Sequence, residues 1–277
     1  MFIEDLHTHT SFSPDGDKAE ENTLYGKARL AKQKGLSYIA FTDHYDFDGS
    51  RGLLHDIDAA KEAVCAAKRD FKDQNFCPLW SIELANVNEF RNEANEILEK
   101  YKFDFVLASL HMTTGEQDAC RMKFDDKDKY PAKRLTEIVD TYLDEVYNIC
   151  KTFDFDSIAH IGYPLRYMKR YGRINELDLR MFDGKLKQIF KLLISRDKCM
   201  EINTSGLRQG YDDTLPSQRA IEMYYELGGR NVTIGSDSHD AATVAADVLQ
   251  VKQLLKKIGF TYTCAFENRK KIEIPLV

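Results

Sequence analysis

Histidines at the ends of strand-like segments constrain the fold of this chain more than any other feature of its sequence. Six of its seven histidines lie where an apolar, strand-like run gives way to a polar stretch, with a carboxylate next to them or nearby. In the first run the two-residue period of a β-strand places His7 and His9 on one face. Similar runs end at His44, His111, His160 and His239. Five predicted strand ends thus carry histidine. The paired imidazoles at the first of these strand ends predict a metal site.

Short β-rich runs alternate along the chain with longer amphipathic ones. Seven strands are predicted, at 2–7, 37–42, 79–84, 103–108, 156–159, 199–203 and 231–235. Helices are predicted near 22–34, 56–73, 88–100, 131–151, 178–196, 216–227 and 241–257. Such alternation gives an α/β fold with parallel strands, and seven repeats can close into a barrel. An open doubly wound sheet is less favoured, because it spreads its strand ends along a line whereas a barrel rim brings them together.

Composition and charge set the broad class of protein. With 277 residues, 43% of them hydrophobic and no linker-like tract, the chain is expected to form one domain over 1–277. The net charge of -6 offers no general attraction for nucleic acid or an anionic membrane, so a small soluble substrate is favoured. We expect a cytoplasmic location, because no signal peptide or membrane span is visible and the six cysteines are scattered without a C-x-x-C pair.

Taken in order, these motifs resemble those of the PHP (polymerase and histidinol phosphatase) family. The resemblance is carried by His7-Thr8-His9-Thr10, Ser13-Pro14-Asp15-Gly16, Thr42-Asp43-His44, Ser109-Leu110-His111, Ala159-His160 and Ser236-Asp237-Ser238-His239. H-x-H alone occurs in other metalloenzymes, but the whole set spans almost the entire chain. The stretch 201–208 and the single-domain length are most similar to the stand-alone histidinol-phosphate phosphatases. The resemblance implies a distorted (β/α)7 barrel with a trinuclear metal site.

Three divalent metals need about nine protein ligands if each keeps an open position. The chain offers His7, His9, Asp15, His44, Glu83, His111, His160, Asp237 and His239. Glu83 is included because an acidic residue is conspicuous near the end of the apolar run 79–84. The family's pattern implies one metal on His7, His9, Glu83 and Asp237, a second on Glu83, His111 and His160, and a third on His44, His239 and Asp15. Zinc, manganese or iron would suit these donors.

Some neighbouring residues keep open or secondary assignments. Asp17 is an alternative to Asp15, because both lie in one glycine-containing loop. Asp43 is predicted to orient a neighbouring imidazole. His55 is left out of the site as an ordinary histidine. Acidic or amide residues near the rim are available to the amine and imidazole of histidinol, namely Asp46, Asp48, Asn86, Asn88 and Asp212.

The resemblance and the donor set together predict hydrolysis of histidinol phosphate. Two metals that share Glu83 would lower the pKa of a bridging water, and the resulting hydroxide would attack phosphorus in line with the departing alkoxide. A guanidinium beside the metals would bind the phosphoryl group through paired donors. The residues predicted to be catalytic are Glu83, Asp237, Arg208 and His239. Those predicted to bind substrate are Arg208, Ser205, Arg166 and Arg170. Arg208 is expected in the loop beyond the sixth strand, and Arg166 and Arg170 in the loop that follows His160.

Two other classes of function stay open. One is a PHP phosphoesterase of different specificity, either a phosphodiesterase acting on nucleic acid or a phosphotyrosine phosphatase. A nuclease should show a basic groove with stacking aromatic residues, and no such stripe stands out in this acidic chain. The other is a non-enzymatic metal-binding module, which is disfavoured because all nine ligand positions carry competent residues.

Overall fold

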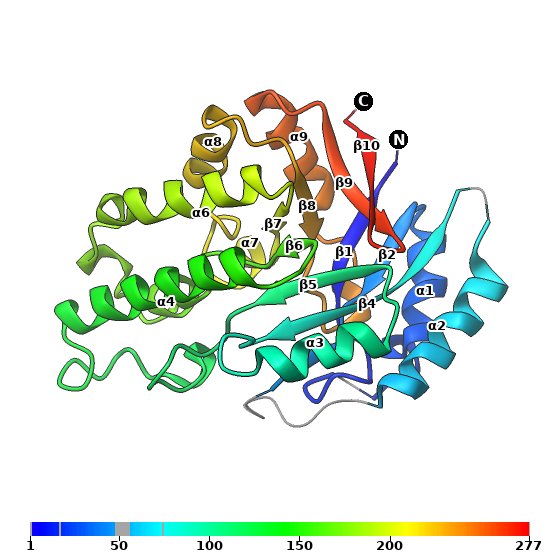
Figure 1. Cartoon of the computed structure of the whole chain (residues 1–277), viewed down its shortest axis with the longest axis horizontal. Helices are drawn as coiled ribbons and strands as arrows, with labels where there is room; N and C mark the ends of the chain where they lie inside the picture. Colours follow the sequence, from blue (N-terminus) through cyan, green and yellow to red (C-terminus); the bar gives the residue numbers. More distant parts are fainter. Residues whose placement is uncertain (1, 17, 48–55, 74, 277) are drawn as a thin grey trace.

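Parallel strands alternate with helices around a nearly closed barrel in the computed structural model, which describes residues 2–16, 18–47, 56–73 and 75–276 (Figure 1). Adjacent strands around the barrel are β1 (Glu4–Thr8), β2 (Tyr38–Phe41), β4 (Cys77–Ala85), β5 (Phe105–Ser109), β6 (Ser157–Ile158), β7 (Cys199–Asn203) and β8 (Val232–Gly235). The short strand β3 (His44–Asp46) follows β2 and also pairs with β4. The predicted α/β fold, a (β/α)7 barrel, is confirmed.

The barrel closes where the segment after β1 meets the segment after β8. Thr8 and Ser238 form an isolated parallel bridge. The backbone N of His9 donates to Ser238 O (2.9 Å), and the backbone N of Asp237 donates to His7 O (2.8 Å). Residues from opposite ends of the sequence therefore face each other across this seam.

Helices surround the strands, and most match the predicted ranges within three residues. The main ones are α1 (Leu24–Gln33), α2 (Ile57–Phe71), α3 (Arg91–Lys100), α4 (Ala132–Thr152), α6 (Asp183–Ser195), α8 (Gln218–Glu226) and α9 (Val248–Ile258). Short 3-10 turns are η1 (Glu20–Asn22), η2 (Ala119–Arg121), η3 (Ile174–Glu176), η4 (Leu179–Phe182) and η5 (Ala241–Thr243). The turns η4 and η5 occupy the starts of two predicted helices, so α6 and α9 begin later than expected.

Two helices replace segments that were expected to be loops. Arg166 and Arg170 lie in α5 (Tyr163–Arg170), and Arg208 ends α7 (Ser205–Arg208). Helix α5 begins after Gly162, which has φ 100°, a conformation that favours glycine, and a proline occupies its first turn. The prediction of loop arginines was wrong, because Pro164 lies in the first turn of α5, where a backbone N–H has no intrahelical partner to lose.

A C-terminal hairpin covers the N-terminal end of the barrel (Figure 1). Its strands, β9 (Tyr262–Glu267) and β10 (Lys270–Pro275), are antiparallel and were not predicted from the sequence. Phe266 stacks on Phe105 with ring centroids 5.2 Å apart, in a buried cluster that includes inward-facing Leu6 and Leu79. The hairpin therefore closes the barrel opposite the strand ends that carry the histidines.

All six cysteines are free thiols. Among the described residues, no helix is both long enough and apolar enough to cross a membrane.

Candidate metal and phosphate site

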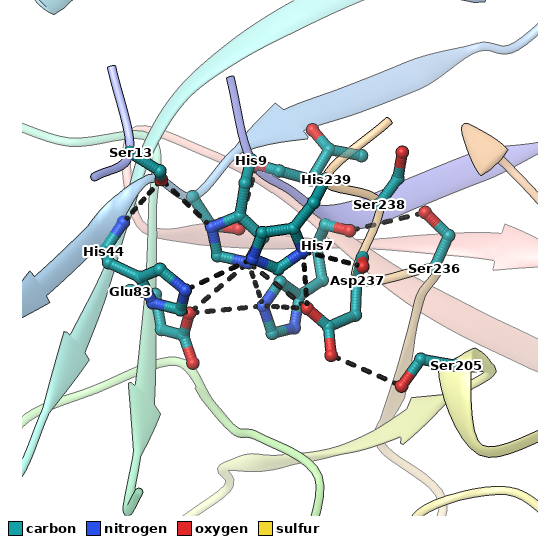
Figure 2. A network of polar contacts seen from close by, with 12 residues as sticks. His7, His9, Ser13, His44, Glu83, Ser205, Ser236, Asp237, Ser238 and His239 are labelled. Carbon is teal, nitrogen blue, oxygen red and sulfur yellow. Dashed lines mark hydrogen bonds and ion pairs between the residues drawn. The ribbon is translucent and has the colours of Figure 1, made fainter. Parts of the chain in front are cut away.

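Strand ends at one rim of the barrel bring the nine predicted ligands into one cluster. Figure 2 shows His7, His9, His44, Glu83, Asp237 and His239 among them. Within strands lie His7 in β1, His44 at the start of β3 and Glu83 in β4. Just beyond strand ends lie His9 after β1, His111 after β5, His160 after β6, and Asp237 and His239 after β8. Asp15 approaches from the loop that follows β1. Every predicted ligand is present in the cluster, while Asp17 and His55 lie outside the described residues.

Four of these side chains converge at the seam between β1 and β8. The Nε2 atoms of His7 and His9 are 3.0 Å apart. Glu83 Oε2 lies 3.3 Å from His7 Nε2 and 3.5 Å from His9 Nε2. Asp237 Oδ1 lies 3.6 Å and 3.3 Å from the same two nitrogens. This is the group that the family resemblance implied for the first metal.

The other carboxylate oxygen of Glu83 faces a second group. Glu83 Oε1 lies 3.2 Å from His111 Nε2 and 3.2 Å from His160 Nε2. Because its two oxygens face different sets of imidazoles, Glu83 has the geometry of a bridge between two cation positions.

A third group lies nearer the surface. Asp15 Oδ2 is 3.2 Å from His239 Nε2 and 3.6 Å from His44 Nε2. The two imidazole nitrogens are 3.4 Å apart. His44 Nδ1 also lies 2.9 Å from Glu83 Oε2, which connects this group to the other two. The side chains of His239 and Asp15 are 32% and 38% exposed, whereas His44 is almost fully buried.

Burial and neighbouring charges both shift the pKa values of these side chains. Burial opposes ionisation of Glu83, but His44, His7 and His111 hold its pKa well below the usual value. Burial also opposes protonation of His7, yet nearby carboxylates raise its pKa well above the usual value. Burial, together with His239 and His44, lowers the pKa of His9. Buried carboxylates that stay ionised require positive charge beside them.

The donor set fits divalent transition metals. Imidazole nitrogens of His7 and His9 face each other at 3.0 Å, and two such lone pairs repel unless a proton or cation lies between them. Sets of three potential ligand atoms, such as those of His44, Glu83 and His111, lie within 4.8 Å of one another. Nitrogen and carboxylate donors in this arrangement suit zinc, manganese or iron.

Hydrogen bonds behind the cluster orient several imidazoles. Asp46 was predicted to lie at the rim, but it is buried and lies 3.0 Å from His111 Nδ1. Asp43 accepts from Ser13 Oγ (2.7 Å), and Ser13 Oγ in turn lies 3.3 Å from His9 Nδ1. Asp43 therefore acts on His9 through Ser13, in line with its predicted orienting role.

Glu201 is a buried carboxylate beside the cluster for which the sequence predicted no role. Its Oε1 lies 2.6 Å from His7 Nδ1, and its Oε2 accepts from the backbone N of His160 (2.8 Å). The Glu201 carboxylate thus contacts His7 of the first group and His160 of the second. The signal was available, because Glu201 interrupts the otherwise largely apolar strand β7 as Glu83 interrupts β4.

Replacing Glu201 with Gln should weaken metal binding by about 10- to 100-fold, because the amide cannot supply the negative charge that orients and polarises His7. Titration of metal into apo-protein, followed by calorimetry, measures this change. Glu226→Gln, at the end of α8, serves as a control for charge loss. An affinity equal to wild type in Glu201→Gln would refute the orienting role.

Two positions in this region have left-handed backbone conformations. Asp237 has φ 54° and His160 has φ 27°, and neither residue is glycine. Such conformations carry a free-energy penalty of about 1–3 kcal/mol and persist where surrounding contacts determine them. Here the backbone contacts of Asp237 with His7 and of His160 with Glu201 supply those restraints.

Arg166 lines a cavity beside the cluster. The cavity wall is formed by Asp15, His44, His111, His160, Tyr163, Arg166, Tyr167, Gln209, Asp237 and His239. The guanidinium of Arg166 is buried between Tyr163 and Tyr167, at 5.0 Å from each ring centroid. It donates to Ser205 Oγ (2.8 Å) and Tyr167 Oη (2.9 Å), while its Nε has no hydrogen-bond partner among the described residues.

The other predicted substrate contacts lie at different depths. Arg208 is half-buried and donates to the backbone oxygens of Ser236 and Asp237, and its buried Nη1 has no hydrogen-bond partner among the described residues. Ser205 is buried behind the cavity wall, where its Oγ donates to Asn203 Oδ1 (2.6 Å). Arg170 is exposed and stacks on Tyr167 at 5.3 Å.

The remaining rim candidates have partners of their own. Asn86 Oδ1 accepts from the backbone N of His111 (3.1 Å), and Asn88 Nδ2 donates to Glu145 O (3.1 Å). Asp212 is largely exposed and pairs with Lys169 (2.9 Å). Asp48 lies outside the described residues.

Comparisons with known proteins identify relatives over nearly the whole chain. A family model described as the PHP domain matches residues 5–205. A probable histidinol-phosphatase of Thermotoga maritima is 28% identical over 273 residues, covering 98% of this chain and 99% of that protein. The histidinol-phosphatase of Lactococcus lactis is 27% identical and covers 96% and 95%. A crystal structure of histidinol phosphate phosphatase from Lactococcus lactis, complexed with zinc, L-histidinol and phosphate, has a TM-score of 0.77 at 23% identity and covers 98% of each chain.

Proposed function

The chain belongs to the PHP domain family, and from that premise we propose that it is a metal-dependent phosphomonoesterase that hydrolyses histidinol phosphate to histidinol and phosphate. The observation that carries this proposal is the convergence of nine imidazole and carboxylate side chains, six of which line a cavity that also contains a buried arginine. Two relatives that match over nearly their whole length, one named histidinol-phosphatase and one probable histidinol-phosphatase, support the choice of substrate.

We further propose three cation positions that follow the three groups of side chains. His7, His9, Glu83 and Asp237 would hold the first, Glu83, His111 and His160 the second, and His44, His239 and Asp15 the third. When bound, divalent cations supply an activated water near neutral pH and offset the charge of a phosphoryl group. Zinc is present in the related Lactococcus lactis structure, and manganese and iron suit the same donors.

The chain's own residues would bind and orient the phosphate. Arg166 is held rigidly between two tyrosine rings, so its unpartnered Nε loses little conformational freedom when it binds an anion. Arg208 has a second unpartnered donor beside Asp237. Both guanidinium groups can therefore donate charge-assisted hydrogen bonds to a phosphoryl group that lies over the ligand cluster.

The proposal is tested by measuring metal content and substrate preference on the same protein samples. Apo-protein is loaded separately with zinc, manganese, iron or cobalt, its metal content is measured, and initial rates are compared on histidinol phosphate, phosphotyrosine and a phosphodiester. We expect about three ions per chain and a kcat/KM for histidinol phosphate at least about a hundredfold above the others. Preference for phosphotyrosine or the phosphodiester would assign a different specificity, and failure to bind metal would refute the site.

A further inference from the structure

Lys27 in α1 is a buried cation close to the seam between β1 and β8. None of its surface is exposed, and its Nζ donates to Ser238 O (2.9 Å) and Ser238 Oγ (3.3 Å). Burial lowers the pKa of Lys27 to about 8, although Asp43, Asp5 and Asp240 attract its charge. An apolar side chain of similar length would avoid the loss of hydration, so this contact calls for a functional reason.

The carbonyl that Lys27 contacts joins two segments that carry candidate ligands. Ser238 O also accepts from the backbone N of His9 (2.9 Å). Ser238 itself lies between Asp237 and His239, on the loop drawn beside His7 in Figure 2. Lys27 therefore fixes, from α1, the peptide that sets the spacing of Asp237 from His239.

The third cation position depends most on this peptide. His239 and Asp15 are about one-third exposed, whereas the side chains of the other two groups are buried. His239 has no strand to hold it, because β8 ends at Gly235. A displacement of the Ser238 peptide would thus move the imidazole of His239 away from Asp15 and His44.

We propose that Lys27 is a positioning residue that holds the Ser238 peptide so that His239, His44 and Asp15 form a competent third metal position. This inference rests on the proposed cation positions. Within the described part of the chain, Lys27 Nζ donates to Ser238 and to none of the nine ligand side chains. Its loss should therefore act through the loop and affect the third position selectively. Residues that orient metal ligands typically change affinity by about 10- to 100-fold.

The experiment is a metal titration of apo-protein carrying Lys27→Met, which keeps the length of the side chain and removes its charge. We expect two ions to bind as in wild type and the third to bind about 10- to 100-fold more weakly. At limiting metal kcat should fall, and excess metal should restore it. Restoration by metal distinguishes positioning of the site from a general loss of structure.

Lys252→Met is the matched control, because Lys252 is also a buried lysine and pairs with Glu4 (2.8 Å) at the opposite end of the barrel. It should lower Tm without changing the metal titration. Unchanged third-ion affinity in Lys27→Met, or equal weakening of all three ions, would overturn the inference, and Lys27→Gln provides the same comparison if Lys27→Met does not fold. A wild-type protein that binds no metal would instead contradict the proposed function.

Discussion

Replacing Glu83 with Gln should reduce kcat by about a thousandfold or more, because this one carboxylate lies beside imidazoles of all three proposed cation positions. Its Oε2 lies 3.3 Å from His7 and 2.9 Å from His44, and its Oε1 lies 3.2 Å from His111. The amide of glutamine is nearly the same size but uncharged, and its NH2 group would face an imidazole nitrogen. Steady-state kinetics and metal analysis on the same samples measure both consequences.

The control for this prediction is Glu267→Gln. Glu267 forms a surface ion pair with Lys72 (3.2 Å) on the hairpin, at the other end of the barrel. Exposed pairs of this kind contribute about 0–1 kcal/mol, so the variant should have wild-type kinetics. If both variants lost activity equally, charge removal anywhere on the chain would explain the loss. The proposed bridging role of Glu83 would then be refuted.

Arg166→Ala should lower kcat/KM by about a hundredfold, because a buried guanidinium that donates to a phosphoryl group contributes two or more charge-assisted hydrogen bonds. Arg208→Ala should raise KM and also lower kcat, since its contacts form in both ground and transition states. Lysine at either position should restore only part of the loss, because an ammonium lacks the planar pair of donors. Metal content should stay at the wild-type level in each variant.

Arg230→Ala provides a matched control for these arginine variants. Arg230 also stacks on a tyrosine, with its guanidinium 3.9 Å from the ring centroid of Tyr225, but it lies before β8 at the opposite end of the barrel. Its kinetics should equal those of wild type. If Arg166→Ala and Arg208→Ala both matched Arg230→Ala, the phosphate would be bound by other groups, and Arg170→Ala would be the next variant to measure.

The barrel and the ligand cluster were predictable because both depend on local sequence patterns that repeat. Each strand end combines an apolar run with a histidine or carboxylate, and parallel strands deliver these ends to the same rim. Glu83 was identifiable as an acidic residue in an apolar strand. Glu201 showed the same signal, but its target, His7 Nδ1, lies 194 positions away in the sequence and no local pattern connects the two residues.

Features that depend on backbone geometry or tertiary contact were less predictable. The β9–β10 hairpin turns at Asn268 and Arg269, which have φ 50° and 62°, without the Asn-Gly or Asp-Gly signal that marks such turns. The short strand β3 exists because β4 extends far enough to pair with it. The deep burial of Arg166 follows from Tyr163 and Tyr167, whose rings enclose it only once α5 has formed.

Because the first proposed cation position lies at the seam between β1 and β8, we expect it to bind metal only after nearly the whole chain has been synthesised. His7 and His9 leave the ribosome early, whereas Asp237 and His239 follow more than two hundred residues later. Until β8 is made, β1 lacks one neighbour and the first cation position lacks a carboxylate. A nascent chain therefore lacks ligands of the first and third proposed cation positions until Asp237 and His239 are made. Metal supply during synthesis should accordingly matter less for these two positions than metal supply after release.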